Sequence, residues 1–83
     1  MSKRATRWLR GYDKVTEVVE IEYPLSEKWE LKRLQDLFGV PVNDPMFSCF
    51  PVGADEAAAL SGAVSGAITL DTHDFFLEAD ADE

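Results

Sequence analysis

The chain has 83 residues and a hydrophobic content of 46%, which fits a single domain with one modest core and excludes a largely disordered protein. The formal net charge is −8 at pH 7, and it is unevenly placed, because all eight basic residues lie in the first 33 positions. Ten of the sixteen acidic residues follow in a half without Lys or Arg, which disfavours nucleic acid and anionic membranes as partners and favours basic protein surfaces.

Two β-strands are predicted near the start of the chain. Residues 5–12 and 16–23 are rich in β-branched and aromatic residues that alternate in character with their neighbours. The turn between them leaves two registers open, because a loop of two residues sets Trp8 opposite Val19 and a loop of four sets it opposite Ile21. A loop of three residues is disfavoured, since it sets Trp8 against a glutamate.

Two helices are predicted in the middle of the chain. Ser26 is a favourable N-cap, and apolar residues recur at helical spacing over residues 27–38, after which Gly39 supplies a stop signal. A second, shorter helix over residues 54–60 follows Gly53 and carries acidic residues in its first turn, where the helix dipole favours them.

Three further extended segments are predicted. Residues 46–50 form a short apolar run, and Pro51 after it indicates an edge strand or an extended segment. Residues 67–70 and 75–79 are apolar, lie on either side of a polar turn and are predicted to be strands.

These elements occur in the order β-β-α-(β)-α-β-β. Strands at both ends with helices between them predict an α+β fold, in which an antiparallel sheet carries two helices packed on one face. We expect a single small domain over residues 1–83, with frayed ends at 1–4 and 80–83. The apolar faces of the elements together predict one core, formed by Trp8, Val19, Ile21, Tyr23, Leu31, Leu34, Phe38, Phe75 and Leu77.

The chain has one cysteine and one histidine. A single cysteine excludes an intramolecular disulfide, and a small domain without disulfides favours a reducing compartment such as the cytoplasm. Cys49 lies in an apolar run, where a free cysteine is usually a small buried hydrophobe. No apolar segment behind the basic N-terminus indicates a secretory signal, and none approaches the length of a membrane span.

The sequence contains no complete catalytic or metal-binding pattern. Cys49 and His73 stand in unrelated local contexts, which argues against a nucleophile and base pair. Asp71, His73 and Asp74 are too few for a zinc site and do not follow the calcium-loop pattern. No glycine-rich phosphate loop is present. We therefore expect a protein that is not an enzyme and that holds no cofactor or metal.

The last predicted strand carries the most distinctive side chains. Alternation places Phe75, Leu77 and Ala79 on one face of the strand and charged residues beside one aromatic on the other. Such a row of acids suits a basic partner surface through steering and charge-assisted hydrogen bonds. The predicted partner-binding residues are Asp71, Asp74, Phe76, Glu78 and Asp80. The alternative is that Phe76 is itself buried and the acids form a solvated edge.

Five short motifs along the chain carry a resemblance: RGYD at 10–13, EYPL at 22–25, NDPM at 43–46, CFPV at 49–52 and DFFLE at 74–78. Together they resemble a family of small, largely uncharacterised bacterial proteins of about this length. That family is similar in type to the immunity proteins of polymorphic-toxin and contact-dependent inhibition systems. The resemblance implies a protein that binds and blocks a cognate toxin domain, often a basic nuclease.

The sequence thus predicts a non-catalytic binding protein, with an immunity-type inhibitor of a basic toxin domain as the leading hypothesis. Its acidic C-terminal half would supply the contact surface. The alternative is a small adaptor or regulatory domain whose acidity serves solubility only, or reflects a high-salt host.

Overall fold

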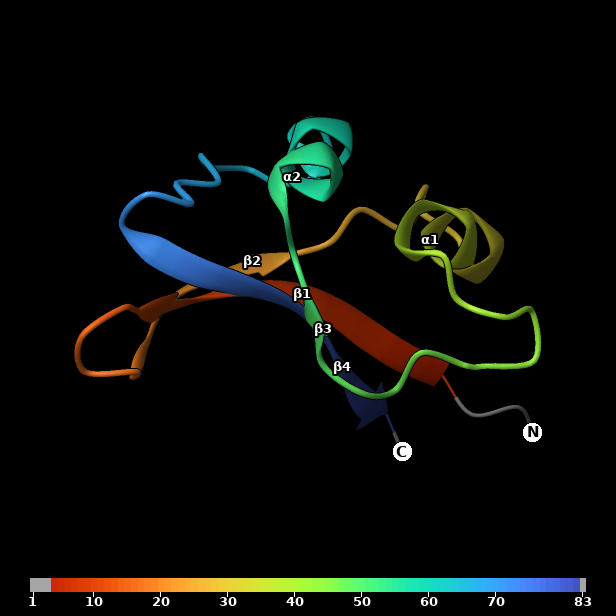
Figure 1. Ribbon diagram of the computed structural model, residues 1–83. Coiled ribbons are helices and arrows are strands. Elements are labelled where there is room, and N and C mark those ends of the chain that lie inside the picture. Colours follow the sequence, from red (N-terminus) through yellow and green to blue (C-terminus); the bar gives the residue numbers. More distant parts are fainter. Residues whose placement is uncertain (1–3, 83) are drawn as a thin grey trace.

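A computed structural model of the protein describes residues 4–82 of the chain, with the side chains of residues 6–80. The elements in chain order are β1 (Arg4–Asp13), β2 (Val19–Pro24), α1 (Leu31–Phe38), β3 (Phe50–Pro51), α2 (Ala54–Leu60) and β4 (His73–Asp82). The four strands form one antiparallel sheet in the order β2-β1-β4-β3, and both helices lie on the same side of it (Figure 1). The α+β class predicted from the sequence is confirmed.

The long central pair β1 and β4 organises the sheet. These strands pair over their whole length, from Arg4 opposite Asp82 to Asp13 opposite His73. Residues 80–82, which were expected to be frayed, therefore extend β4 within the sheet, and residue 4 pairs with them. The other residues of the expected frayed ends, 1–3 and 83, lie outside the described part of the chain.

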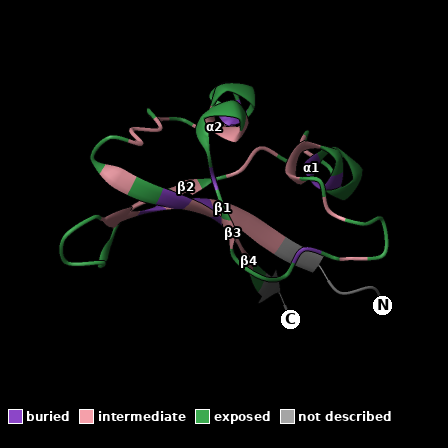
Figure 2. Ribbon diagram, viewed as in Figure 1, coloured by how far each residue is buried: buried purple, intermediate pink, exposed green. Residues whose placement is uncertain are grey.

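The core lies between the sheet and the two helices (Figure 2). Alternation along β1 and β4 directs Leu9, Phe75 and Leu77 toward Leu34 of α1 and Leu60 of α2, and each of these five side chains is at most 2% exposed. Burying such a side chain contributes roughly 1.5–3 kcal/mol. Partly buried side chains surround this cluster, among them the predicted core residues Ile21, Tyr23 and Phe38.

A glycine in β1 makes room for the largest core side chain. Gly11 lies opposite Phe75 in the pairing of β1 with β4, and a Cβ atom on Gly11 would come within 2.9 Å of the Phe75 ring. The ring therefore packs directly on the bare backbone of β1. Tyr23 of β2 stacks beside it, with ring centroids 6.3 Å apart.

The prediction for the face of β1 is wrong. Leu9 and Gly11 face the helices, while Trp8 lies on the opposite face, paired with Pro24 rather than with Val19 or Ile21. The connection is longer than either predicted loop, and a β-bulge at Gly11/Tyr12 shifts the register. The observed pairing places the side chains of β1 and β2 on the same faces of the sheet as the disfavoured three-residue loop would have placed them.

The predicted helices are confirmed in place, with one difference in length. Gly39 ends α1 in the left-handed conformation with φ 67°, and Gly53 precedes α2, as expected. The first helix begins at Leu31 rather than at residue 27, because residues 27–28 form a turn after Ser26. Leu31 consequently lies at the exposed start of α1 and is 37% exposed, so its prediction as a core residue is wrong.

Two other predicted features differ from the structure. Residues 67–70 are not a strand but an irregular segment that leads into the turn before β4. Their backbone instead accepts a hydrogen bond from the Tyr23 hydroxyl and turns at Thr69. Val19, a further predicted core residue, is 39% exposed at the start of β2. The predicted edge strand near Pro51 is confirmed as β3, although only Phe50 and Pro51 form it.

Candidate functional site

The side of the sheet that faces away from the helices is the candidate site, and we call it the open face. The strand alternation that sends Leu9 and Leu77 into the core sends their neighbours to this side. The open face is formed by Trp8, Arg10, Tyr12, Glu22, Asp74, Phe76, Glu78 and Asp80. Three strands contribute to it, so it brings together residues from both ends of the sequence.

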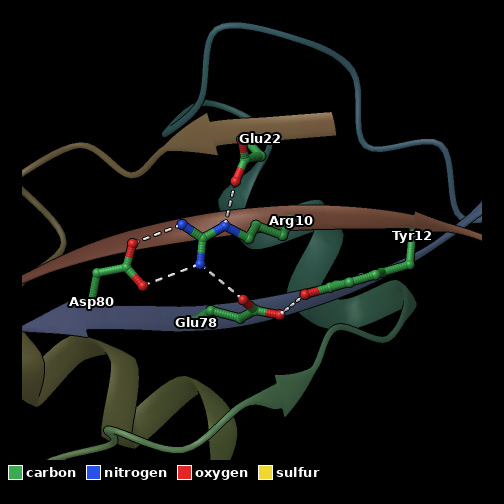
Figure 3. A network of polar contacts seen from close by, with 5 residues as sticks. All are labelled: Arg10, Tyr12, Glu22, Glu78 and Asp80. Carbon is green, nitrogen blue, oxygen red and sulfur yellow. Dashed lines mark hydrogen bonds and ion pairs between the residues drawn. The ribbon is translucent and has the colours of Figure 1, made fainter. Parts of the chain in front are cut away.

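Arg10 binds three carboxylates at the centre of the open face (Figure 3). Its Nε donates to Glu22 at 2.7 Å, Nη1 donates to Glu78 at 2.9 Å, and Nη2 donates to Asp80 at 2.7 Å. The Arg10 and Glu78 side chains are only 15% and 12% exposed, whereas those of Glu22 and Asp80 are about half exposed. These bonds, first to Asp80 and then to Glu78, raise the pKa of the guanidinium and hold three strands together.

Aromatic groups flank this network on both sides. The Tyr12 hydroxyl donates to the second oxygen of Glu78 at 2.5 Å, and this bond raises the pKa of Tyr12 to about 12. The Tyr12 ring packs edge-on against Phe76, with centroids 5.7 Å apart. On the other side Arg10 lies 5.3 Å from the centre of the Trp8 ring. Among residues 6–80, the indole Nε1 of Trp8 is a buried donor without a hydrogen-bond acceptor.

A pocket of about 390 Å³ opens beside the network. Its walls hold two aromatic rings, one thiol and four carboxylates, contributed by Tyr12, Asp13, Glu17, Cys49, Asp74, Phe76 and Glu78. The pocket is open to solvent, most of its exposed lining is apolar, and its acids attract cations. This arrangement suits a cationic group with an apolar stem.

Cys49 lies at this pocket and not in the core, so the prediction that it is buried is wrong. The residue is exposed, although partial desolvation and the neighbouring Glu78 raise the pKa of its thiol. The thiol is therefore mostly protonated at neutral pH, and it lacks the electropositive surroundings of a reactive cysteine.

The structure brings together four of the five residues predicted for partner binding. Asp74, Phe76, Glu78 and Asp80 share the open face, as the alternation of β4 predicted. Asp71 lies outside it, in the exposed turn before β4, and has no polar partner among the described residues. The sequence left open whether Phe76 is exposed beside the acids or buried, and in the structure it is partly buried.

The acids are less free than the sequence suggested. Glu78 and Asp80 bind Arg10, and Asp74 binds Lys14 at 2.7 Å. Glu78 is not part of a solvated edge, because Arg10 and Tyr12 cover its carboxylate. Sequence reasoning missed Arg10 and Tyr12 because their register with β4, across 66 to 70 residues of chain, has no local signal.

Comparison with known proteins finds one family. The family model described as Domain of unknown function (DUF7683) matches residues 6–78. No curated protein matches the chain. The matched segment contains both helices and the whole of the open face except Asp80. No helix among residues 4–82 is long and apolar enough to cross a membrane.

Proposed function

The chain belongs to the DUF7683 family of domains of unknown function, and we propose from its open face that it is a non-catalytic protein-binding domain of the immunity type. In this proposal it binds a cognate bacterial toxin domain, often a basic nuclease, and blocks it. An Arg or Lys side chain of the toxin enters the pocket beside Arg10, and the acids around the pocket steer the encounter.

The observation that carries the proposal is the uncovered sheet face with its acid-lined pocket. Both helices lie on the other side of the sheet (Figure 1). Two aromatic rings, Tyr12 and Phe76, form part of the pocket wall together with four carboxylates. A guanidinium group fits such a wall through stacking on the rings and through paired hydrogen bonds to carboxylate oxygens.

The Arg10 network supports binding by fixing the pocket wall in advance. Glu78 is held by both Arg10 and Tyr12, so its carboxylate loses little further freedom when a partner arrives. Because Arg10 already compensates Glu78 and Asp80, steering falls mainly to the exposed acids at the pocket, namely Glu17 and Asp74, whose ion pair with Lys14 is exposed to solvent on both sides.

A second candidate is an adaptor or regulatory domain whose acidity serves solubility only. One observation favours it: Arg10 pairs with Glu22, Glu78 and Asp80, so these acids have a role in the folded sheet without any partner. The two candidates differ in what the exposed pocket acids do. Only the immunity-type protein needs Glu17 and Asp74 to reach its partner.

The test compares two charge-matched double variants. Glu17→Gln with Asp74→Asn removes two exposed acids at the pocket, of which Asp74 pairs with Lys14. Glu27→Gln with Asp36→Asn removes two exposed acids near α1, of which Asp36 pairs with Lys32. Both pairs of changes lower the net negative charge equally, and both replace a carboxylate that pairs with one surface lysine.

The immobilised wild-type protein first captures its partner from the native host. The captured protein is then expressed alone and together with each variant, and growth is measured. We expect the partner to arrest growth, the wild-type and the α1 variant to restore it, and the pocket variant to fail. Association rates at two salt concentrations should show slower binding and a weaker salt dependence for the pocket variant alone. A partner without effect on growth, or equal rescue by both variants, contradicts the proposal.

A further inference from the structure

We infer that Asp13, Glu20 and His73 form a binding site for one divalent transition-metal ion of the zinc class. One ligand atom from each side chain lies within 4.8 Å of the others. The three residues come from the end of β1, the beginning of β2 and the beginning of β4. A metal there would tie the β1–β2 hairpin to β4 at one end of the sheet.

The strand pairing explains how these residues meet. Asp13 and His73 are direct partners in the pairing of β1 with β4. Glu20 is the extra residue in the β-bulge, since Val19 pairs with Tyr12 and Ile21 pairs with Gly11. A bulge turns its extra residue out of the regular alternation. This brings Glu20 Oε1 to 2.8 Å from His73 Nε2.

Hydrogen bonds orient the histidine for metal binding. His73 Nδ1 lies 2.9 Å from the Thr72 hydroxyl, which itself donates to the carbonyl oxygen of Thr69 at 3.2 Å. The same hydroxyl lies 3.0 Å from the Thr69 hydroxyl, and it can accept from Nδ1 when its own hydrogen is donated to either oxygen of Thr69. In the tautomer with the proton on Nδ1, Nε2 faces the Glu20 carboxylate with a lone pair that can bind a metal ion. Such an outer hydrogen bond is the usual support of a metal-binding histidine.

The aspartate is oriented in the same way. Its Oδ1 accepts the backbone N–H groups of Val15 and Thr16 at 2.8 and 2.9 Å. These bonds fix the carboxylate at the start of the hairpin loop. The site is shielded on the side of His73, whose side chain is 16% exposed, and open on the side of Glu20, whose side chain is 50% exposed. Partial shielding reduces the competition of water for the ion.

The donor set selects the class of ion. One imidazole nitrogen with two carboxylates suits zinc and its transition-metal neighbours, whereas magnesium and calcium prefer oxygen ligands alone. Three protein ligands leave a coordination position for water or for a partner's side chain. From the sequence, Asp71 and Asp74 beside His73 were too few for a metal site, and the structure places Asp74 on the open face, where it binds Lys14.

The site is tested by calorimetric titration of the full chain with zinc chloride, in a Cys49→Ser background that removes the exposed thiol as a zinc ligand. We expect one saturable site and a higher melting temperature with zinc, because an ion that binds only the folded state stabilises it. Magnesium chloride at the same concentration should have neither effect.

Variants then assign the ligands. His73→Gln and Glu20→Gln should each weaken zinc binding by at least about tenfold, while Asp71→Asn, which removes an exposed acid two residues before His73, should not. Glu20→Gln keeps a hydrogen-bond acceptor for the histidine, so it separates metal binding from folding. Absence of saturable binding in the Cys49→Ser background, or unchanged affinity in both ligand variants, would overturn the inference and leave His73 and Glu20 as a simple ion pair.

Discussion

Leu9 and Arg10 are neighbours in β1, and they point to opposite faces of the sheet. Leu9 is fully buried beneath the helices, and its partner Leu77 in β4 is 1% exposed. Arg10 lies on the open face and binds three carboxylates, two of them about half exposed. The same two strands thus carry an apolar interface on one side and a network of ion pairs on the other.

The two faces stabilise the fold in different ways. The helix face depends on the apolar area removed from water, an interaction that is non-directional, does not titrate and is not screened by salt. The open face depends on directed bonds from one guanidinium, whose attraction is partly screened by solvent and whose loss leaves several acids uncompensated. Substitutions on the helix face should therefore cost more stability, and those on the open face should alter its response to pH and salt.

The largest effect is expected on the helix face. Leu9→Ala should lower the free energy of unfolding by roughly 2–5 kcal/mol, because it removes a fully buried side chain and leaves a cavity against α1 and α2. That is a large share of the stability of a small domain. The measurement is chemical denaturation followed by tryptophan fluorescence.

The matched control is Val15→Ala, which removes apolar atoms from a side chain that is 89% exposed in the hairpin loop. The midpoint of its denaturation curve should stay close to that of the wild type. Equal losses in Leu9→Ala and Val15→Ala would contradict the assignment of Leu9 to the core.

The sequence predicted β4 better than β1 for a physical reason. In β4 apolar residues at Phe75 and Leu77 alternate with acids, so only one face can enter the core. In β1 large aromatic residues such as Trp8 point to one face of the strand, and Leu9 points to the other. Trp and Tyr combine a large apolar ring with a polar tip and are stable at a partly exposed surface, so size alone pointed to the wrong face.

The candidate site was predictable only in part. Alternation brought the acids of β4 together, but nothing local indicated that Arg10 would bind them, because that depends on strand register. No local pattern in the sequence indicated the bulge that sets the register of β2. Arg10 and Glu78 lie 68 positions apart in the chain, so their ion pair can be predicted only once the fold is known.

A smaller effect is expected on the open face. Arg10→Met keeps the apolar stem of the side chain but removes all bonds to Glu22, Glu78 and Asp80. We expect a loss of about 1–2 kcal/mol in the free energy of unfolding, since partly exposed ion pairs contribute little and the acids can recover water. The loss should shrink at high salt, unlike that of Leu9→Ala.

A double-mutant cycle with Glu78→Gln isolates the central pair. The loss caused by Arg10→Met should be smaller in the Glu78→Gln background than in the wild type, because one of the three carboxylates no longer carries a charge. Additive losses would show that Arg10 and Glu78 do not stabilise one another, and the two faces would then differ less than the structure indicates.

The smallest effect is on the response to acid, and it concerns Asp80 at the edge of the network. The hydrogen bond from Arg10 lowers the pKa of the Asp80 carboxyl below its usual value, which is about 3.9 in an unfolded chain. A carboxyl with a lower pKa in the folded state stabilises the fold at neutral pH, and this contribution is lost as the pH falls through the folded pKa. NMR titration should find the pKa of Asp80 lowered in the wild type and restored toward its usual value in Arg10→Met.

In the same range of pH, below about 4, the stability of Arg10→Met should fall less steeply than that of the wild type. Asp80→Asn serves as the control, since removal of the titrating group should also make the fall in acid less steep while the apolar face is left intact. If the pKa of Asp80 in the wild type is not lowered, the bond from Arg10 is too weakly populated in solution. The pH dependence of stability would then not distinguish the open face from the helix face.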